Sequence, residues 1–280
     1  MGLSRTVILF VVASGLSLIL GVLRIPNVFH GSLYMIGAFI AYTISRAMGG
    51  SDLGFWLALI GAPLGVGLIS LLVERGLFQF LYEREHLMLI LFTFAFSLVF
   101  ADMVKFVWGA EFKSVPVPHL FNGFVRLFAG TPLPRYNIFL LIMGPAVAVG
   151  LWLLTRTKIG KISQAAAVDR EMVGAVGINV SWVFAAVFVI GCLLAGFGGV
   201  LVAPTLSITL GMDSIVMDGF LIVIIGGLGN VWGALVGSLI FGLSQAIGVF
   251  IWPQFGVLFP YLAVITVLLV RPKGLLRSTW

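Results

Sequence analysis

The chain has 280 residues, of which 61% are hydrophobic and only 9% are charged. Soluble domains carry about 25% charged residues, so this composition excludes a soluble enzyme or binding module and indicates an integral membrane protein. The net charge of +6 does not indicate a nucleic-acid partner, because most basic residues lie between apolar runs, where they set membrane orientation. The one cysteine, Cys192, lies inside an apolar run, which excludes an internal disulfide and argues against a bound metal.

Apolar runs of about 20 residues are long enough to span a bilayer as helices. They predict an all-α polytopic bundle of eight or nine spans, forming one domain over residues 1–280, with broken helices as a possibility. We interpret the first run as a retained helix and not as a cleaved signal peptide. The runs fall at residues 6–23, 31–48, 55–73, 87–108, 137–154, 181–203, 213–228, 231–251 and 256–270.

The connection at residues 155–180, here called the coupling segment, is too polar to span a membrane. Placing it in the cytoplasm puts ten of the 16 basic residues inside, as the positive-inside rule favours. Its apolar residues recur at helical spacing, which predicts one amphipathic helix bounded by two glycines. We interpret it as a docking helix for a cytoplasmic subunit; a membrane-surface helix is the alternative. The candidate contact residues are Gly160, Ala165, Ala166, Asp169, Arg170, Glu171 and Gly177.

Residues 27–34, NVFHGSLY, place polar side chains in a membrane-associated segment with a glycine that we expect to break the helix. Polar groups at this depth usually mark a transport path or hydrogen bonds between helices. His30 either contacts substrate or has a structural role, in which it stabilises the expected helix break. Two hydroxyl residues one helical turn apart in the fourth run either face the path or bond back to the helix carbonyls. The candidate path residues are Asn27, His30, Gly31, Ser32, Tyr34, Thr93 and Ser97.

A glycine-rich break joins the seventh and eighth runs at Gly226, Gly227, Gly229 and Asn230. In lipid, backbone that leaves a helix needs partners from neighbouring protein, water or a ligand. We interpret the break as a tight, closely packed helix junction near the inner face, with substrate contact as the less favoured alternative. Residues 27–31 weakly resemble residues 230–233, a pattern typical of transporters with paired broken helices.

The sequence contains no GxxxxGK[ST] phosphate loop and no HExxH, CxxC or GxSxG motif. No catalytic constellation is therefore expected, and energy for active transport must come from another subunit or an ion gradient. Three classes remain at this point: the membrane subunit of an ATP-driven importer, an ion-coupled secondary transporter, and a small-solute channel.

Five blocks, in this order, resemble the permeases of branched-chain (hydrophobic) amino acid ABC importers. The first is GLSLILGVLRIPNVFHGSLYMIGAFIAY, and the second, in the coupling segment, is RTKIGKISQAAAVDREMVGAVGINV. The others are FVIGCLLAGFGGVLVAP, FLIVIIGGLGNVWGALVGSLIFG and VLLVRPKGLL. Asn27, His30 and Gly31 match the Asn, His and Gly of the family's first block, whose Phe-Ala is Val28-Phe29 here.

This resemblance implies a multi-pass subunit of the bacterial inner membrane that carries amino acids or related small organic solutes. The implied partners are a second, homologous permease chain, two cytoplasmic ATPase subunits, a periplasmic substrate-binding protein and membrane lipid, with no nucleic acid. ATP and magnesium belong to the ATPases, and no cofactor is expected on this chain. The substrate stays open among branched-chain and other amino acids, urea or short amides, and aromatic acids.

Overall fold

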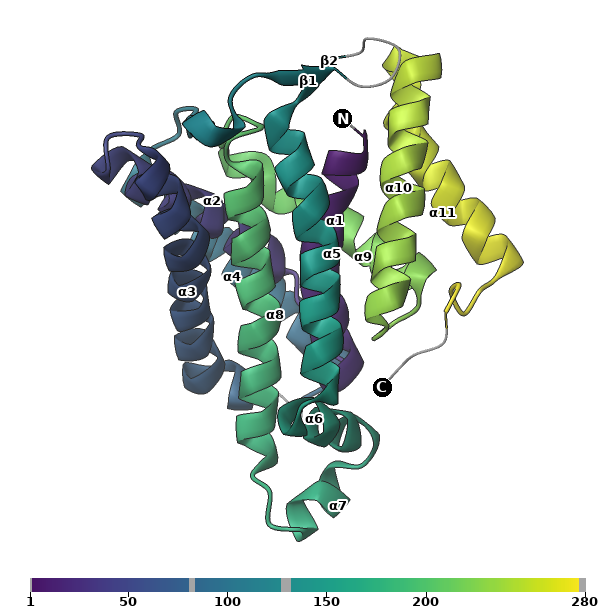
Figure 1. Cartoon of the computed structure of the whole chain (residues 1–280). Coiled ribbons are helices and arrows are strands. Elements are labelled where there is room, and N and C mark those ends of the chain that lie inside the picture. Colours follow the sequence, from purple (N-terminus) through teal and green to yellow (C-terminus); the bar gives the residue numbers. More distant parts are fainter. Residues whose placement is uncertain (1, 81–83, 127–131, 277–280) are drawn as a thin grey trace.

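The computed structural model describes residues 2–80, 84–126 and 132–276, and in this part the protein is an almost entirely helical bundle (Figure 1). This confirms the predicted all-α polytopic fold. The helices are α1 (Gly2–Leu23), α2 (Phe29–Ala47), α3 (Asp52–Gly76), α4 (His86–Trp108), α5 (Arg135–Arg156), α6 (Lys158–Val168), α7 (Arg170–Ala175), α8 (Val180–Val202), α9 (Ile215–Gly226), α10 (Val231–Ile251) and α11 (Leu258–Val270).

Nine of these helices coincide with the nine predicted apolar runs. Within the described residues, α1, α3, α4, α5, α8 and α10 are long and apolar enough to cross a membrane on their own. The helix α9 has 12 residues and α11 has 13. At 1.5 Å per residue each covers about 20 Å, less than the hydrocarbon core of about 30 Å. The predicted eight or nine spans are therefore an approximate count.

The helix α8 is the packing centre of the bundle, because the three most extensive helix–helix contacts all involve it, with α3, α1 and α2. Glycines make these contacts close. A Cβ built on Gly199 would lie 2.2 Å from the carbonyl oxygen of Tyr34, and one on Gly37 would lie 2.5 Å from that of Gly196. Small residues that let backbones approach are typical of helix packing in membranes.

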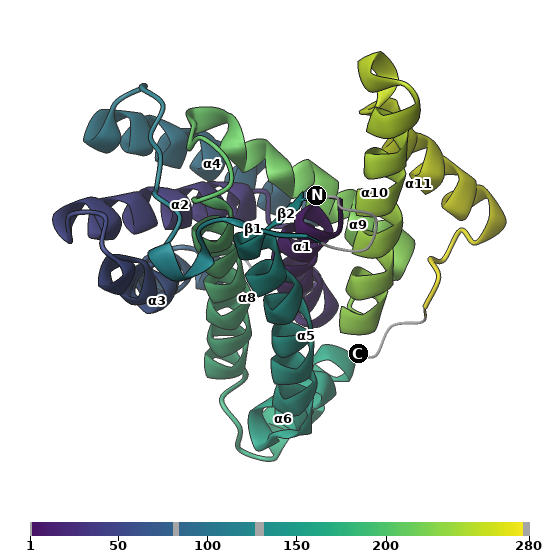
Figure 2. The same cartoon turned by 45° about the horizontal axis from the view of Figure 1, so that its top comes forward.

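The helix α1 runs through the interior of the bundle, with 17 of its 22 residues buried. It contacts α8, α10, α9 and α5, and its N-terminal end lies between α5 and α10 (Figure 2). A helix that is apolar on every side suits such a fully enclosed position. The first apolar run is thus part of the folded core.

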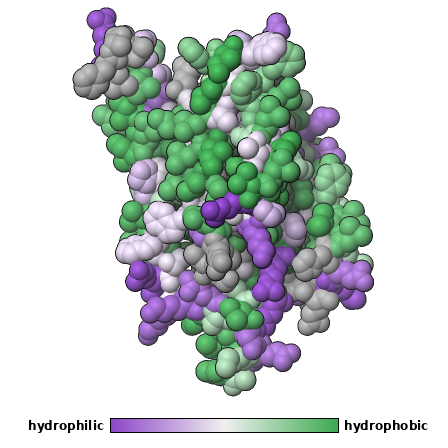
Figure 3. Space-filling view, turned by 90° about the vertical axis from the view of Figure 1, so that its right-hand side faces the viewer, coloured by the Kyte–Doolittle hydropathy of each residue, from purple (hydrophilic) through white to green (hydrophobic). Residues whose placement is uncertain are grey.

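The long connection between α4 and α5 covers one end of the bundle (Figure 1). It contains η2 (His119–Phe121) and an antiparallel pair of short strands, β1 (Phe124–Arg126) and β2 (Pro132–Pro134). The helices α6 and α7 lie at the opposite end, where hydrophilic side chains gather below a broad hydrophobic band (Figure 3). Following the positive-inside assignment, we call these the outer and inner ends. Further short 3₁₀-helices are η1 (Phe78–Phe80), η4 (Leu210–Ser214) and η5 (Pro253–Phe255).

The coupling segment forms two helices, so the prediction of one continuous amphipathic helix was wrong. The break falls at Asp169, whose backbone is extended (φ −143°, ψ 103°). Its Oδ1 accepts a hydrogen bond from the Met172 amide at 2.9 Å. Aspartate competes with helical bonding by capping a new helix in this way. Asp169 therefore separates α6 from α7 and starts the second helix.

Replacing Gly199 with alanine should destabilise the bundle, because the new methyl group would clash with the backbone of α2. Overpacking of this kind costs about 1–3 kcal/mol, so the Tm in detergent should fall by at least about 3 °C. Gly150 in α5 has no neighbouring atom within 4 Å of the position that a Cβ would take, so Gly150→Ala is the matched control and should leave the Tm unchanged or raise it. Equal effects of the two substitutions would contradict the proposed role of α8.

Candidate functional site

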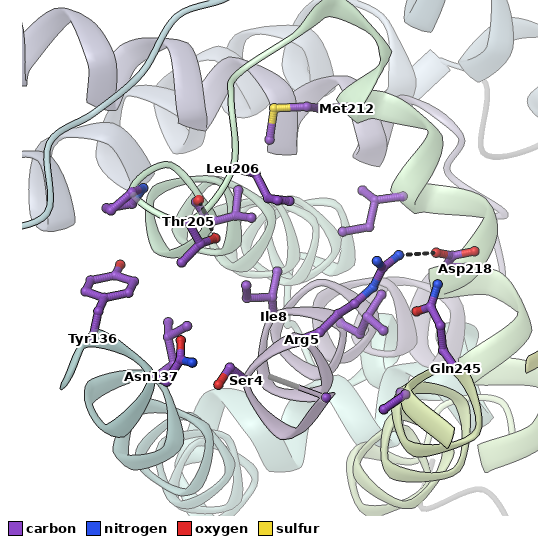
Figure 4. A pocket seen from close by; sticks show the side chains of 18 of the residues that line it. Ser4, Arg5, Ile8, Tyr136, Asn137, Thr205, Leu206, Met212, Asp218 and Gln245 are labelled. Atoms are coloured by element: carbon purple, nitrogen blue, oxygen red, sulfur yellow. Dashed lines mark hydrogen bonds and ion pairs between the residues drawn. The ribbon is translucent and has the colours of Figure 1, made fainter. Parts of the chain in front are cut away.

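A cavity of about 820 Å³ opens near the outer end of α1, among α1, α5, the end of α8, α9 and α10; we call it the outer cavity (Figure 4). Its volume lies in the range of about 300–1,000 Å³ that is usual for small-molecule sites. Most of its wall is aliphatic. The aliphatic and thioether side chains include Ile8, Leu9, Leu140, Leu206, Met212 and Val249.

An ion pair joins two walls of the outer cavity. The Arg5 guanidinium of α1 lies 4.0 Å from the Asp218 carboxylate of α9. The Arg5 side chain is 53% exposed and that of Asp218 is 20% exposed. Gln245 of α10 lies beside the pair (Figure 4), and its Oε1 is buried without a hydrogen-bond partner among the described residues. The cavity thus combines both signs of charge with an unused acceptor.

The opposite wall of the outer cavity comes from the start of α5. Tyr136 and Asn137 line it (Figure 4), and the Tyr136 hydroxyl donates a hydrogen bond to the Leu201 carbonyl at 2.9 Å. Because this hydroxyl is held by the backbone of α8, it fixes the position of the wall. Tyr34 also lines the cavity.

Tyr34 is the only predicted path residue that lines the outer cavity. Two others, Ser32 and Ser97, join α2 to α4 through hydroxyl oxygens 2.9 Å apart. The Thr93 hydroxyl lies within hydrogen-bonding distance of the Ile90 and Pro26 carbonyls, at 3.0 and 3.3 Å. Hydrogen bonds of this kind hold helices together in membranes. Their part in a transport path stays a prediction.

The expected break at Gly31 was wrong, because Gly31 lies inside α2. A Cβ there would lie 2.1 Å from the Asp213 carbonyl oxygen, so this glycine allows η4 to pack on α2. The chain breaks earlier, at Arg24 with φ 58°, just before Pro26, whose ring lacks an amide donor and disfavours helix in the preceding residue.

Asn27 and His30 are fully buried next to this break. The Nε2 atom of His30 lies 3.1 Å from the Val12 carbonyl of α1, a contact that ties α2 to α1. The side-chain amide of Asn27 has no hydrogen-bond partner among the described residues. Neither residue lines the outer cavity.

A second hollow, the inner cleft, has a volume of about 450 Å³ and lies between the inner end of α1, Leu89 and the junction of α6 with α7. Beside the inner cleft, two hydrogen bonds join the inner end of α1 to the coupling segment. The Arg24 guanidinium donates to the Ala167 carbonyl at 3.3 Å, and the Arg170 guanidinium donates to the Leu23 carbonyl at 3.5 Å. The inner end of α1 is therefore bound directly to the coupling segment.

The other candidate contact residues of the coupling segment have different environments. Gly160 packs on α5, since a Cβ there would lie 2.2 Å from the Leu154 carbonyl oxygen. Ala166 is buried, whereas Ala165 and Glu171 are exposed. Gly177, with φ 85°, follows the end of α7.

A patch of exposed apolar side chains also lies on α6, α7 and the residue that follows. Met172 and Val176 belong to the apolar face of the helix predicted from the sequence, whereas Val168 was not part of that prediction. Val168 is 77% exposed, Met172 is 67% exposed and Val176 is 75% exposed. We call these three residues the tip patch.

The glycine-rich junction connects α9 to α10 at the inner end of the bundle. The Asn230 Oδ1 accepts a hydrogen bond from the Gly233 amide at 3.0 Å and so caps α10. A Cβ on Gly226 would lie 2.2 Å from the Gly233 carbonyl oxygen. Gly227 and Gly229 have φ values of 108° and 75°, which side-chain-bearing residues rarely adopt.

The residues that sequence reasoning missed as a site are Arg5, Asp218 and Gln245. Each lies in a different apolar helix, and ionisable residues in such helices are by default candidates for function. No sequence spacing pairs them, because they come from opposite ends of the chain. Among the described residues, no group of three histidine, cysteine, aspartate or glutamate side chains could hold a metal ion.

Comparison with known proteins places these features in a family. A family model described as the permease component of branched-chain amino acid transport systems matches residues 1–268. The chain is 26% identical to the high-affinity branched-chain amino acid transport system permease protein LivH of Escherichia coli (strain K12), over 95% of this chain and 90% of the relative. It is 27% identical to the permease protein BraD of Pseudomonas aeruginosa, with the same coverage.

A probable LivH of Methanocaldococcus jannaschii is 25% identical over 98% of this chain and 90% of the relative. No solved structure matches. The match to the family model covers nearly the whole chain, including the helices that line the outer cavity and the coupling segment. The chain therefore belongs to the permease component family of branched-chain amino acid transport systems.

Proposed function

We propose that this chain is one of two permease subunits of an ATP-driven importer in the inner membrane, carrying aliphatic amino acids. The names of its relatives refer to branched-chain amino acid transport. The aliphatic wall of the outer cavity suits an aliphatic side chain, and the two opposite charges suit an amino acid backbone. The second permease is a homologous but different chain, and a periplasmic binding protein delivers the substrate to the outer end.

The observation that carries the proposal is the path of α1. Its outer end contributes Arg5 and Ile8 to the outer cavity, and its inner end is hydrogen-bonded to the coupling segment. A buried, continuous helix transmits displacement along its axis because its packed neighbours resist deformation. Movement of α6 and α7 would therefore reach the outer cavity through α1 and change the side from which substrate has access.

The tip patch supports docking of a cytoplasmic ATPase. Large apolar side chains are exposed there at the polar inner end, beyond the hydrophobic band of the bundle (Figure 3). Apolar surface in such a position fits a protein partner. Two ATPase subunits would hold ATP and magnesium, and their closure would push on α6 and α7.

The two rival functions differ from this proposal in their need for energy. An ion-coupled transporter or a channel needs no ATPase, whereas the importer moves substrate uphill only with ATP. Purified subunits in liposomes decide between them. Leucine uptake should require ATP, both ATPases and the binding protein; uptake against a gradient by this chain without any ATPase would contradict the proposal.

Met172→Glu should weaken association with the ATPase, because it places a charge in the tip patch that the partner must bury. We expect ATPase co-purification to fall at least about tenfold. Lys158→Glu is the control, since Lys158 is exposed on α6 outside the patch. Reversing the charge of Asp169 is a poorer test, because that side chain caps α7. Unchanged co-purification with Met172→Glu would contradict docking at the tip patch.

Arg170→Gln should uncouple ATP hydrolysis from transport, since it removes the donor to the Leu23 carbonyl and the cation that lies over the Phe184 ring. We expect leucine transported per ATP to fall by at least about threefold, as loss of one or two hydrogen bonds allows, while the complex still assembles. Lys161→Gln, at an exposed position of α6, is the matched control. A loss of transport and ATPase activity in equal proportion would instead indicate a role in assembly.

A further inference from the structure

We propose that Arg5 and Asp218 together bind the zwitterionic backbone of an α-amino acid in the outer cavity. Arg5 binds the carboxylate, Asp218 binds the ammonium group, and the aliphatic wall receives the side chain. This inference rests on the proposed transport function and names the substrate chemistry of its site.

The geometry of the ion pair leaves both charges available to a ligand. At 4.0 Å the guanidinium and carboxylate attract each other, but the separation is too long for a hydrogen bond. The guanidinium has N–H groups arranged for a bidentate bond to a carboxylate. Charge-assisted hydrogen bonds are roughly twice as strong as neutral ones. An amino acid zwitterion lying alongside the two side chains in the outer cavity would supply those bonds to both.

Gln245 gives an independent indication of a ligand with donor groups. Its Oε1 is buried beside the ion pair and has no hydrogen-bond partner among the described residues (Figure 4). An unsatisfied buried acceptor costs about 1–3 kcal/mol, and such a group is expected where a ligand completes its bonding. The ammonium group of an amino acid has three N–H donors, enough for Asp218 and Gln245 together.

The remaining wall selects among the substrates that the sequence left open. Ile8, Leu206 and Met212 line the cavity (Figure 4) and offer only apolar surface to a side chain. Urea and short amides carry no ionic groups to satisfy the charges. Aromatic acids without an amino group would supply no N–H donor to Asp218 or Gln245. The geometry therefore favours aliphatic α-amino acids.

The two charges also lie on different helices, α1 and α9. A bound zwitterion would bridge these helices and hold them together. Because α1 is hydrogen-bonded to the coupling segment at its inner end, occupancy of the site would bias the position of that segment. Substrate in the outer cavity would thus be sensed at the ATPase side.

The first test neutralises both charges in one protein, Arg5→Gln with Asp218→Asn, so that neither charge is left without its partner. The complex should still assemble, while leucine transport falls at least about tenfold. Arg46→Gln with Glu111→Gln is the matched control, since both residues lie outside the cavity and are exposed. Leucine transport at the control level in the first protein would overturn the inference.

A second test reads the site directly and does not depend on the charge variants. Cys192 is fully buried, so Thr205→Cys places a single reactive thiol at the edge of the cavity. In the assembled complex without binding protein, leucine should slow labelling by a water-soluble thiol reagent at least about threefold. The analogues 4-methylpentanoate and isoamylamine, which each lack one charge, should not. Glu111→Cys is the control, because Glu111 is exposed in the connection between α4 and α5 and does not line the cavity. This thiol should be labelled equally with and without leucine.

The outcomes separate this inference from the proposed function. Import of leucine by the complete complex without protection of Thr205→Cys would overturn only the zwitterion site. Equal protection by leucine and its one-charge analogues would also overturn it. If the complete complex with ATP imported no amino acid at all, the proposed function itself would fail.

Discussion

Burial of α1 on every side is the constraint on which the rest of the structure depends. An enclosed helix needs neighbours around its whole circumference, and α8, α9, α10 and α5 supply them. Glycines of α8 allow α1 and α2 to approach closely enough to fill the interior. The same arrangement places Arg5 at one end of α1 beside a cavity and Arg24 at the other end against the coupling segment. Packing and the proposed transport mechanism therefore depend on the same helix.

Polar residues inside the bundle fall into two groups, according to whether neighbouring helices supply their hydrogen-bond partners. Ser32, Ser97 and His30 find partners on neighbouring helices and act as contacts between them. The ion pair of Arg5 with Asp218 is longer than a hydrogen bond, and Gln245 retains a buried acceptor. Polar groups at membrane depth are costly. Those that the protein itself satisfies hold the fold together, and those that it leaves incompletely satisfied at the wall of a cavity are the better candidates for a substrate site.

The expectations from sequence succeeded where the signal was local. Each apolar run became a helix, and the segment too polar to span became the helices α6 and α7 outside the hydrophobic band. They failed where one residue type is compatible with two different local structures. Asp169 capped a new helix in place of continuing the old one, and Gly31 served close packing in place of a break. The path residues at positions 27–34 were chosen because they are polar, but polarity does not distinguish a contact between helices from a cavity wall.

The sequence by itself determined the membrane class, the approximate positions of the helices, the family and the location of the coupling segment. The length of an apolar run decides whether it can span the bilayer, and the placement of basic residues sets its orientation. Both can be read from the chain without knowing which helices are neighbours. Only the tertiary structure decided that Arg5, Asp218 and Gln245 meet at one cavity. It also decided that α1 joins that cavity to α6 and α7. These relations depend on which helices become neighbours, and that is set by close packing between segments far apart in the chain, which no local pattern encodes.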